Sequence, residues 1–487
     1  MLNVLFLNPP FLKNYSRIQR SPGVTKSGTI YYPYWLCSAA GVIQNKHNIK
    51  IIDATPHNLS LQQVKEQLLN FIPDIIIIET STPSIYNDLK VAKQLKEWYP
   101  NSIIAFVGLH VSALPEETLK IVDAVDVVMR GEYDYIVRDF VDAVENNLDW
   151  QNILGISFRR NGKIFHNAPA PLIENLDELP FLSKIYKNFL NIKDYYFAAA
   201  DYPMVMMITG RGCPFKCFYC VYPQVMHGRK YRFRSALNVV EEFKYIKENI
   251  QEVKEIVIED DTFTANPKRV REICELLIKE KIRLKWSCNA RANLDKETMK
   301  LMKEAGCRLL IVGYESGVQE ILYNMNKNLK LEDAIEFTKN AHKAGLLIHG
   351  CFMLGNPGET KETIKKTYEF AKKLKCDSTQ FYPLFIYPGT EAYQWALKNN
   401  YISTTDYSKW LNPKGRHNCV IDLPDLKGDE ITKISEVLTF KYHIRASYFI
   451  YKFFQIFKNP REFLRTLRSG LKYFKQLLVN FLFIIKK

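Results

Sequence analysis

The sequence holds 487 residues, enough for two or more domains with full hydrophobic cores. Its ten cysteines, and an opening stretch without a basic leader, favour a reduced cytoplasmic protein over a secreted disulfide framework. The net charge is +15, but residues 441–487 carry +10 of it, from eleven Lys or Arg against one acid, Glu462. The basic character therefore belongs to the tail, and we expect no nucleic-acid partner.

Residues 1–145 alternate runs rich in Ile and Val with amphipathic stretches. We expect strands at 2–8, 49–54, 74–79, 102–108 and 126–131, with helices at 35–44, 61–71, 84–98 and 115–122. This alternation predicts an α/β fold with a doubly wound parallel sheet. Ligands of such sheets bind beyond the carboxyl ends of the strands. The candidate binding residues there are Asn8, Pro9, Asp53, Thr80, Ser81, Gly108, His110, Gly131 and Glu132.

Residues 146–200 read as a linker that lies across two domains. Asn161-Gly162 is typical of a hairpin turn, and Pro169, Pro171 and Pro180 indicate extended, irregular chain.

A second domain, 201–395, repeats the alternation. Strands are expected at 204–209, 255–259, 284–289, 309–314, 347–354 and 379–385, and helices at 236–249, 267–279, 296–305, 331–344 and 361–374. Residues 396–440 form an extension to this domain. Sites on parallel barrels form at the carboxyl ends of their strands.

Three cysteines follow the first of these strands at the spacing C-x3-C-x2-C: Cys213, Cys217 and Cys220. Three thiolates on one loop can hold three irons of a cubane cluster and leave the fourth iron open. A structural zinc site needs four closed ligands, and no matching C-x2-C pair follows. The remaining alternative is three unrelated buried cysteines.

At this spacing the chain resembles the radical SAM superfamily. The resemblance implies a 4Fe-4S cluster that cleaves S-adenosylmethionine to a 5′-deoxyadenosyl radical, an external electron donor, and a partial (β/α)6 barrel over 201–395. It also implies a cosubstrate pocket at the strand ends. Glu259, Asp260 and Asp261 would suit the ammonium group, and Asn289 and Arg291 the ribose and carboxylate. Glu315 would hydrogen-bond in the pocket, and Gly355 would allow close approach to the adenine. Phe218 and Tyr219, inside the motif, belong to the same set.

The N-terminal domain resembles the cobalamin-binding domain that precedes the barrel in one radical SAM subclass. Cobalamin is therefore an expected cofactor. The D-x-H-x-x-G motif that supplies a lower cobalt ligand is absent, because Asp53 is followed by Pro56-His57 at a different spacing. We expect His110 to be a loop or pocket residue rather than a cobalt ligand.

Residues 441–487 mix aromatic residues and Leu with regularly spaced Lys and Arg. Residues 448–457 and 463–468 predict a basic amphipathic helical tail, and the last apolar run, 477–485, is too short to span a bilayer. We favour peripheral binding at the inner face of an anionic membrane. The alternative is a helical pair folded back on the barrel with its basic face in solvent.

The motif order, with Trp286-Ser287-Cys288-Asn289-Ala290 and Gly228-Arg229-Lys230-Tyr231-Arg232, resembles radical SAM proteins of hopanoid biosynthesis and, more distantly, the anaerobic magnesium-protoporphyrin IX monomethyl ester cyclase group. The hypothesis is an enzyme that methylates, cyclises or oxidises an unactivated carbon of a lipid-like or other apolar small molecule. Two rivals remain: a tRNA-modifying radical SAM enzyme, and a non-enzymatic iron–sulfur or cobalamin sensor. The catalytic residues beyond the cluster ligands are not identified by the sequence.

Overall fold

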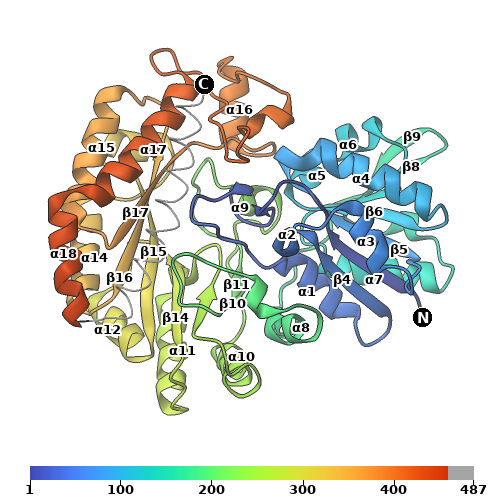
Figure 1. Ribbon diagram of the computed structural model, residues 1–487, viewed down its shortest axis with the longest axis horizontal. Helices are drawn as coiled ribbons and strands as arrows, with labels where there is room; N and C mark the ends of the chain where they lie inside the picture. Colours follow the sequence, from blue (N-terminus) through green and yellow to red (C-terminus); the bar gives the residue numbers. More distant parts are fainter. Residues whose placement is uncertain (459–487) are drawn as a thin grey trace.

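The computed structural model describes residues 1–458. Two α/β domains lie side by side, and residues 9–33, here called the arm, run between them (Figure 1). The arm carries only the short antiparallel pair β2 (Tyr15–Ser16) and β3 (Gly23–Val24). One continuous hydrophobic core extends through both domains.

The N-terminal sheet has the strand order β4-β1-β5-β6-β7-β8-β9. Strands β4 (Asn48–Asp53), β1 (Asn3–Asn8), β5 (Ile75–Glu79), β6 (Ile103–Val107) and β7 (Val127–Met129) are parallel, as predicted. All five residues of β5 are buried, because helices cover both faces of the sheet. The helices include α1 (Tyr34–Ile43), α3 (Leu61–Gln67), α4 (Ile85–Trp98), α6 (Pro115–Ile121) and α7 (Asp134–Glu145). Helix α7 was not among the predicted helices.

The predicted hairpin exists but does not belong to a linker. Strands β8 (Ile156–Arg160) and β9 (Lys163–His166) extend the sheet antiparallel from β7, with Val128 opposite Ser157. The N-terminal domain therefore reaches His166, and the predicted boundary at 145/146 falls too early. The irregular connection begins only after this hairpin and includes α8 (Leu182–Phe189).

The second sheet has six parallel strands in sequence order, as expected for the partial barrel. They are β10 (Met204–Met207), β13 (Glu255–Ile258), β14 (Lys285–Ala290), β15 (Cys307–Glu315), β16 (Leu347–Leu354) and β17 (Ser378–Pro383). The intervening helices include α10 (Ala236–Asn249), α11 (Pro267–Lys279), α12 (Lys296–Glu304), α14 (Leu331–Lys343) and α15 (Lys361–Leu374). The right-handed crossovers of such units bring all six carboxyl ends to one mouth.

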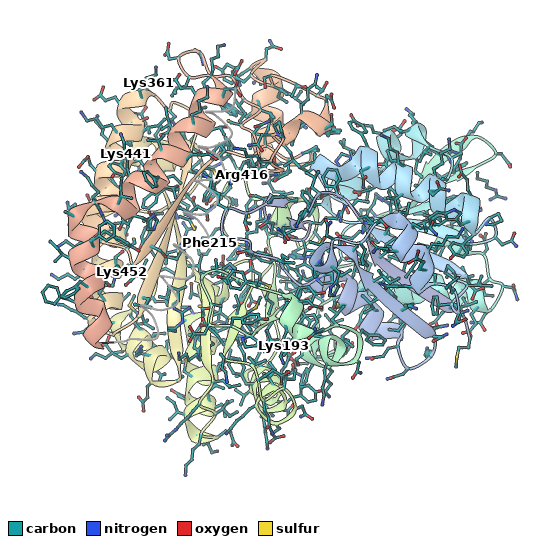
Figure 2. The ribbon with its side chains drawn as sticks, in the orientation of Figure 1. Lys193, Phe215, Lys361, Arg416, Lys441 and Lys452 are labelled. Carbon is teal, nitrogen blue, oxygen red and sulfur yellow. The ribbon has the colours of Figure 1, made fainter. Side chains whose placement is uncertain are left out.

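The C-terminal helices α17 (Gly428–Ile444) and α18 (Ala446–Lys458) form a pair on the barrel flank, where Figure 2 labels Lys441 and Lys452. Tyr448 Oη donates to the Asp377 carbonyl at 2.9 Å, and Lys452 is 7% exposed beside the Tyr448 ring. The outward face of α18 is aromatic and aliphatic, with Phe449, Ile450, Phe453 and Phe454 each more than half exposed.

The pair therefore folds back on the barrel, but the exposed surface that we describe on α18 is apolar rather than basic. The predicted segments at 463–468 and 477–485 lie outside the described residues. Within residues 1–458, no helix combines the length and apolarity that crossing a membrane requires.

Candidate functional site

The cysteine loop follows β10 at the barrel mouth and leads into α9 (Val221–Val225). Cys213 and Cys217 are buried and Cys220 is half-buried, and the sulfurs of Cys213 and Cys217 lie close enough to Cys220 to raise the pKa of its thiol. Burial raises the pKa of the Cys213 and Cys220 thiols. Gly212 has φ +83°, and a Cβ there would lie 2.2 Å from the Lys230 carbonyl oxygen, so the tight approach to the loop requires glycine. Three thiols on one loop, with no fourth cysteine on that loop, fit a cluster with an open iron.

Two buried ion pairs tie this loop to the N-terminal domain. Arg211 donates to both carboxylate oxygens of Asp134, at 2.7 and 3.0 Å, and its guanidinium lies 4.9 Å from the Trp35 ring. Arg232, on β12 (Arg232–Phe233), forms a bidentate pair with Glu132 at 2.8 and 2.5 Å. Because bidentate pairs fix orientation, the N-terminal domain sets the position of the cluster loop.

The acidic run after β13 divides into one available and two engaged carboxylates. Asp260 accepts from the Thr209 amide and hydroxyl, both at 2.6 Å. Asp261 accepts from the Gly212 amide at 3.0 Å and from His227 Nδ1 at 2.8 Å. Glu259 keeps one oxygen, Oε2, without a hydrogen-bond partner among the described residues. Asp260 and Asp261 thus shape the cluster loop, and Glu259 is the acid with a free ligand-binding atom.

Glu315 joins three elements around the same mouth. It accepts from Tyr219 of the cysteine loop at 2.9 Å, from Lys327 at 2.9 Å and from Tyr382 of β17 at 3.1 Å. The backbone of Glu315 has φ +65°, at a bulge where β15 loses register with β16. The cation of Lys327 balances this buried carboxylate.

The other predicted cosubstrate residues lie nearby, with different surroundings. Asn289 is half-buried and donates to the Asp260 carbonyl at 3.2 Å. Arg291 stacks 3.9 Å from the Phe215 ring and donates to the carbonyls of Lys327 and Asn328, so its guanidinium supports the loop (Figure 2 labels Phe215). Phe218 packs against Trp395, and the Gly355 amide donates to Glu359. Arg291 and Phe218 therefore have structural contacts, and direct ligand contacts from them remain a prediction.

A small hollow of about 20 Å³ lies between the two domains. Of the nine predicted cobalamin-binding residues, Thr80, Ser81 and Gly108 line it; from the barrel side come Tyr222, Met226 and Tyr387. Gly108 has φ +113°, and a Cβ there would lie 2.7 Å from both Glu79 Oε1 and the Thr80 carbonyl. The sequence analysis missed Arg17, Arg20, Trp35 and Glu79, which also line this hollow. Burial raises the pKa of Glu79 to about 7.

The remaining predicted cobalamin residues are used inside the fold. Asn8 donates to Asp53 at 2.8 Å, and the Pro9 carbonyl accepts from the buried Arg17 at 3.0 Å. His110 is buried against the Tyr407 ring and contacts Thr82, and burial lowers its pKa to about 3. The Gly131 amide donates to Ser112, and Glu132 is paired with Arg232. These six residues lie outside the lining of the hollow.

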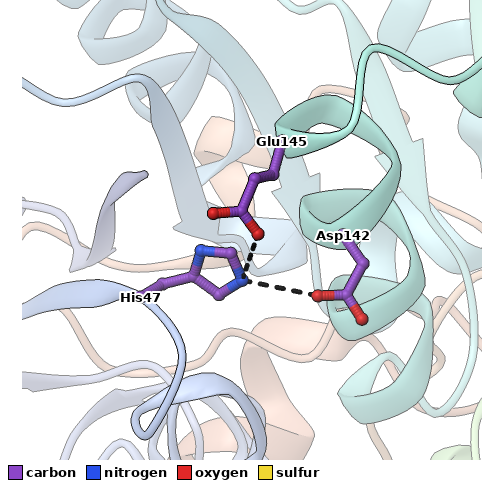
Figure 3. A group of neighbouring side chains, drawn as sticks. All are labelled: His47, Asp142 and Glu145. Carbon is purple, nitrogen blue, oxygen red and sulfur yellow. Dashed lines mark hydrogen bonds and ion pairs between the residues drawn. The ribbon is translucent and has the colours of Figure 1, made fainter. Parts of the chain in front are cut away.

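A second group of potential metal ligands, His47, Asp142 and Glu145, lies on the N-terminal domain (Figure 3). His47 Nδ1 accepts from the Leu2 amide at 3.4 Å, so the neutral ring carries its proton on Nε2, which faces Asp142 at 3.4 Å. The Met1 amine is 2.5 Å from Glu145, and the Lys46 ammonium is 3.5 Å from Asp142. These cations already neutralise the carboxylates, and the ring nitrogen presents a proton rather than a lone pair.

Comparison with known proteins agrees with this geometry. Residues 207–371 match the model of the radical SAM superfamily, and residues 20–141 match that of the B12 binding domain. An uncharacterized methyltransferase of Pyrococcus horikoshii is 31% identical over 93% of this chain and 95% of its own length. The chain belongs to the radical SAM superfamily. More specifically, this radical SAM protein carries an N-terminal B12 binding domain.

Further relatives extend the comparison. The anaerobic magnesium-protoporphyrin IX monomethyl ester cyclase of Cereibacter sphaeroides is 27% identical over 84% of this chain and 66% of its own length, which confirms the predicted similarity to that group. Among solved structures, the radical SAM methyltransferase TsrM of Kitasatospora setae, with cobalamin and a 4Fe-4S cluster bound, has a TM-score of 0.66 at 15% identity. That match covers 89% of this chain and 81% of TsrM. The fold class is thereby confirmed.

The protein is a radical SAM enzyme, and its cofactors are a 4Fe-4S cluster, S-adenosylmethionine and cobalamin. The residues present fit these groups. Three buried or half-buried thiols converge on one loop, and a buried carboxylate oxygen lacks a partner among the described residues. At the hollow, Gly108 leaves space that no side chain could share, because a Cβ there would lie 2.7 Å from Glu79 Oε1 and from the Thr80 carbonyl oxygen.

Proposed function

We propose that this radical SAM enzyme modifies an unactivated carbon of a lipid-like or otherwise apolar substrate. The observation that supports the proposal is the hollow shared by the two cofactor-binding domains, where Trp35, Tyr222, Met226 and Tyr387 lie beside charged residues such as Arg17 and Glu79. The apolar and aromatic side of this lining favours a substrate with a substantial apolar part. Methylation and radical cyclisation or oxidation both stay within the proposal, because the relatives include a methyltransferase and a cyclase.

The proposed roles follow from position. Cys213, Cys217 and Cys220 hold the cluster, while Glu259, Asn289 and Glu315 offer polar atoms to S-adenosylmethionine beside it. Thr80, Ser81 and Gly108 bound the cobalamin end of the hollow. When bound, the cluster and S-adenosylmethionine supply an adenosyl radical, and cobalamin supplies a carrier for a methyl group. The chain positions these groups and keeps water from the space between them.

We propose that the enzyme binds peripherally to the cytoplasmic face of a membrane. The four apolar side chains exposed on α18 lie at positions i, i+1, i+4 and i+5 and so form one face. They lie within residues 441–487, which carry +10 of the net charge of +15. Aromatic side chains next to basic residues favour peripheral attachment to an anionic surface.

Vesicle co-sedimentation tests this attachment. The double variant F449S/F453S should bind anionic vesicles less than the unchanged protein, because burial of apolar area contributes to insertion. The matched control is L69S/I72S, which removes two equally exposed apolar side chains, 77% and 70% exposed, from the N-terminal domain. Equal sedimentation of all three proteins would remove α18 from the membrane argument.

Lipid profiling of a deletion strain tests whether the substrate is a lipid. The proposal predicts that a lipid species loses one modification, such as a methyl group or a ring, and that the unchanged gene restores it. Unaltered lipids together with altered tRNA nucleosides would favour the tRNA-modifying alternative instead.

A further inference from the structure

Arg20 brings a positive charge from the N-terminal arm into the mouth of the barrel. Its Nη2 donates to the Asp260 carbonyl at 2.7 Å, its Nε lies 3.7 Å from Glu259 Oε1, and its Nη1 lies 3.8 Å from Asp261 Oδ1. The side chain is 35% exposed and also lines the hollow between the domains. Arg20 therefore contacts all three residues of the acidic loop from the side of the N-terminal arm.

Among the three acids, only Glu259 has an oxygen that could serve a ligand. Both oxygens of Asp260 accept from Thr209, and Asp261 is held by Gly212 and His227 on one oxygen and by Arg20 on the other. Glu259 is 6% exposed, its Oε1 faces Arg20, and its Oε2 has no partner among the described residues. A buried carboxylate oxygen without a donor is costly unless a ligand supplies one.

The charge of Arg20 also opposes the effect of burial on Glu259. Burial raises the pKa of this carboxyl, while Arg20 and the Asn289 side chain act in the opposite direction. Without that cation, the carboxyl would be buried beside two other acids, Asp260 and Asp261, which disfavour its charge.

We infer that Arg20 is a positioning residue of the S-adenosylmethionine site, which orients Glu259 through Oε1 and leaves Oε2 to accept from the ammonium group of the ligand. A residue of the N-terminal domain thus completes a binding site on the barrel. The inference rests on the proposed function, since it assigns this site to S-adenosylmethionine.

The test measures equilibrium binding to the full-length, cluster-loaded protein. Two probes are compared: S-adenosylmethionine, and 5′-methylthioadenosine, which shares the adenosine and sulfur but lacks the amino-acid group. R20Q should weaken S-adenosylmethionine binding about tenfold or more, which corresponds to the loss of one charge-assisted hydrogen bond. The same variant should change 5′-methylthioadenosine binding less than about twofold. R20K should recover part of the loss, because it restores the charge without the guanidinium geometry.

The matched control is K13A, which removes an exposed cation from the same arm and should bind both probes as the unchanged protein does. Iron content and urea midpoint, measured on every variant, show whether R20Q is folded; should it unfold, R20K alone carries the comparison. Unchanged S-adenosylmethionine binding in R20Q, or an equal loss for both probes, would overturn the role of Arg20. If the unchanged cluster-loaded protein failed to bind S-adenosylmethionine at all, the proposed function itself would fall.

Discussion

The bidentate pair between Glu132 and Arg232 offers a direct measure of how firmly the two domains are joined. Both side chains are 1% exposed, and Arg232 also donates to the carbonyls of Ile173 and His227. Glu132→Ala leaves the guanidinium charge buried without its counter-ion. Removing one partner of a buried pair costs about 3–5 kcal/mol, so the urea midpoint should fall by roughly 0.5–1 M, since the urea m-value is large for a chain of this length.

The control for this prediction lies two residues away. Lys230 and Glu174 form a pair at 2.6 Å, but they are 67% and 65% exposed, so Lys230→Ala should leave the urea midpoint almost unchanged. The double variant E132L/R232M should regain most of the loss, because it removes both charges and keeps the volume. Equal midpoints for E132A and K230A would refute the view that buried pairs join the domains.

Three further predictions concern the cofactors and pH. C213A/C217A/C220A should lose the 4Fe-4S cluster in an iron assay while C37A retains it; a full iron content in the triple variant would contradict the ligand assignment. G108V should abolish cobalamin loading, because a Cβ at 108 would lie 2.7 Å from Glu79 Oε1, whereas G162A, in open space at the β8–β9 turn, should load normally. Burial raises the pKa of Glu79 from 4.5 to about 7, so its protonated form contributes stability that is present below about pH 4.5 and lost as the pH rises through about 7. Urea unfolding at pH 5 and pH 8 should show E79Q losing less stability than the unchanged apoprotein, by up to about 3 kcal/mol, and parallel losses would contradict it.

Much of the fold could be predicted because parallel sheets buried on both faces leave a clear record in sequence. The Ile75–Ile78 run is continuous, and helical stretches separate it from its neighbours. The hairpin was recognised from Asn161-Gly162, but its attachment to β7 was not, since pairing with a distant strand leaves no local signal. The same limit applies to the exposed face of α18, where Lys452 is buried while Phe449, Phe453 and Phe454 are exposed.

The site was predictable only as far as local motifs extend. The cysteine spacing and the acids after β13 stand out in the sequence, yet nothing local separates Glu259 from Asp260 and Asp261. Their difference comes from Thr209, His227 and Arg20, which approach from other elements. Likewise, six of the nine residues expected at the cobalamin site make contacts inside the fold and lie outside the lining of the hollow, and tertiary contacts alone reveal this.

The most direct test of the central claim is the formation of 5′-deoxyadenosine. Anaerobically reconstituted protein, given S-adenosylmethionine and a strong reductant, should release 5′-deoxyadenosine, and C213A/C217A/C220A should release none. Absence of the product from protein that carries a full four-iron cluster, or its equal formation by the triple variant, would contradict the account of this chain as a radical SAM enzyme.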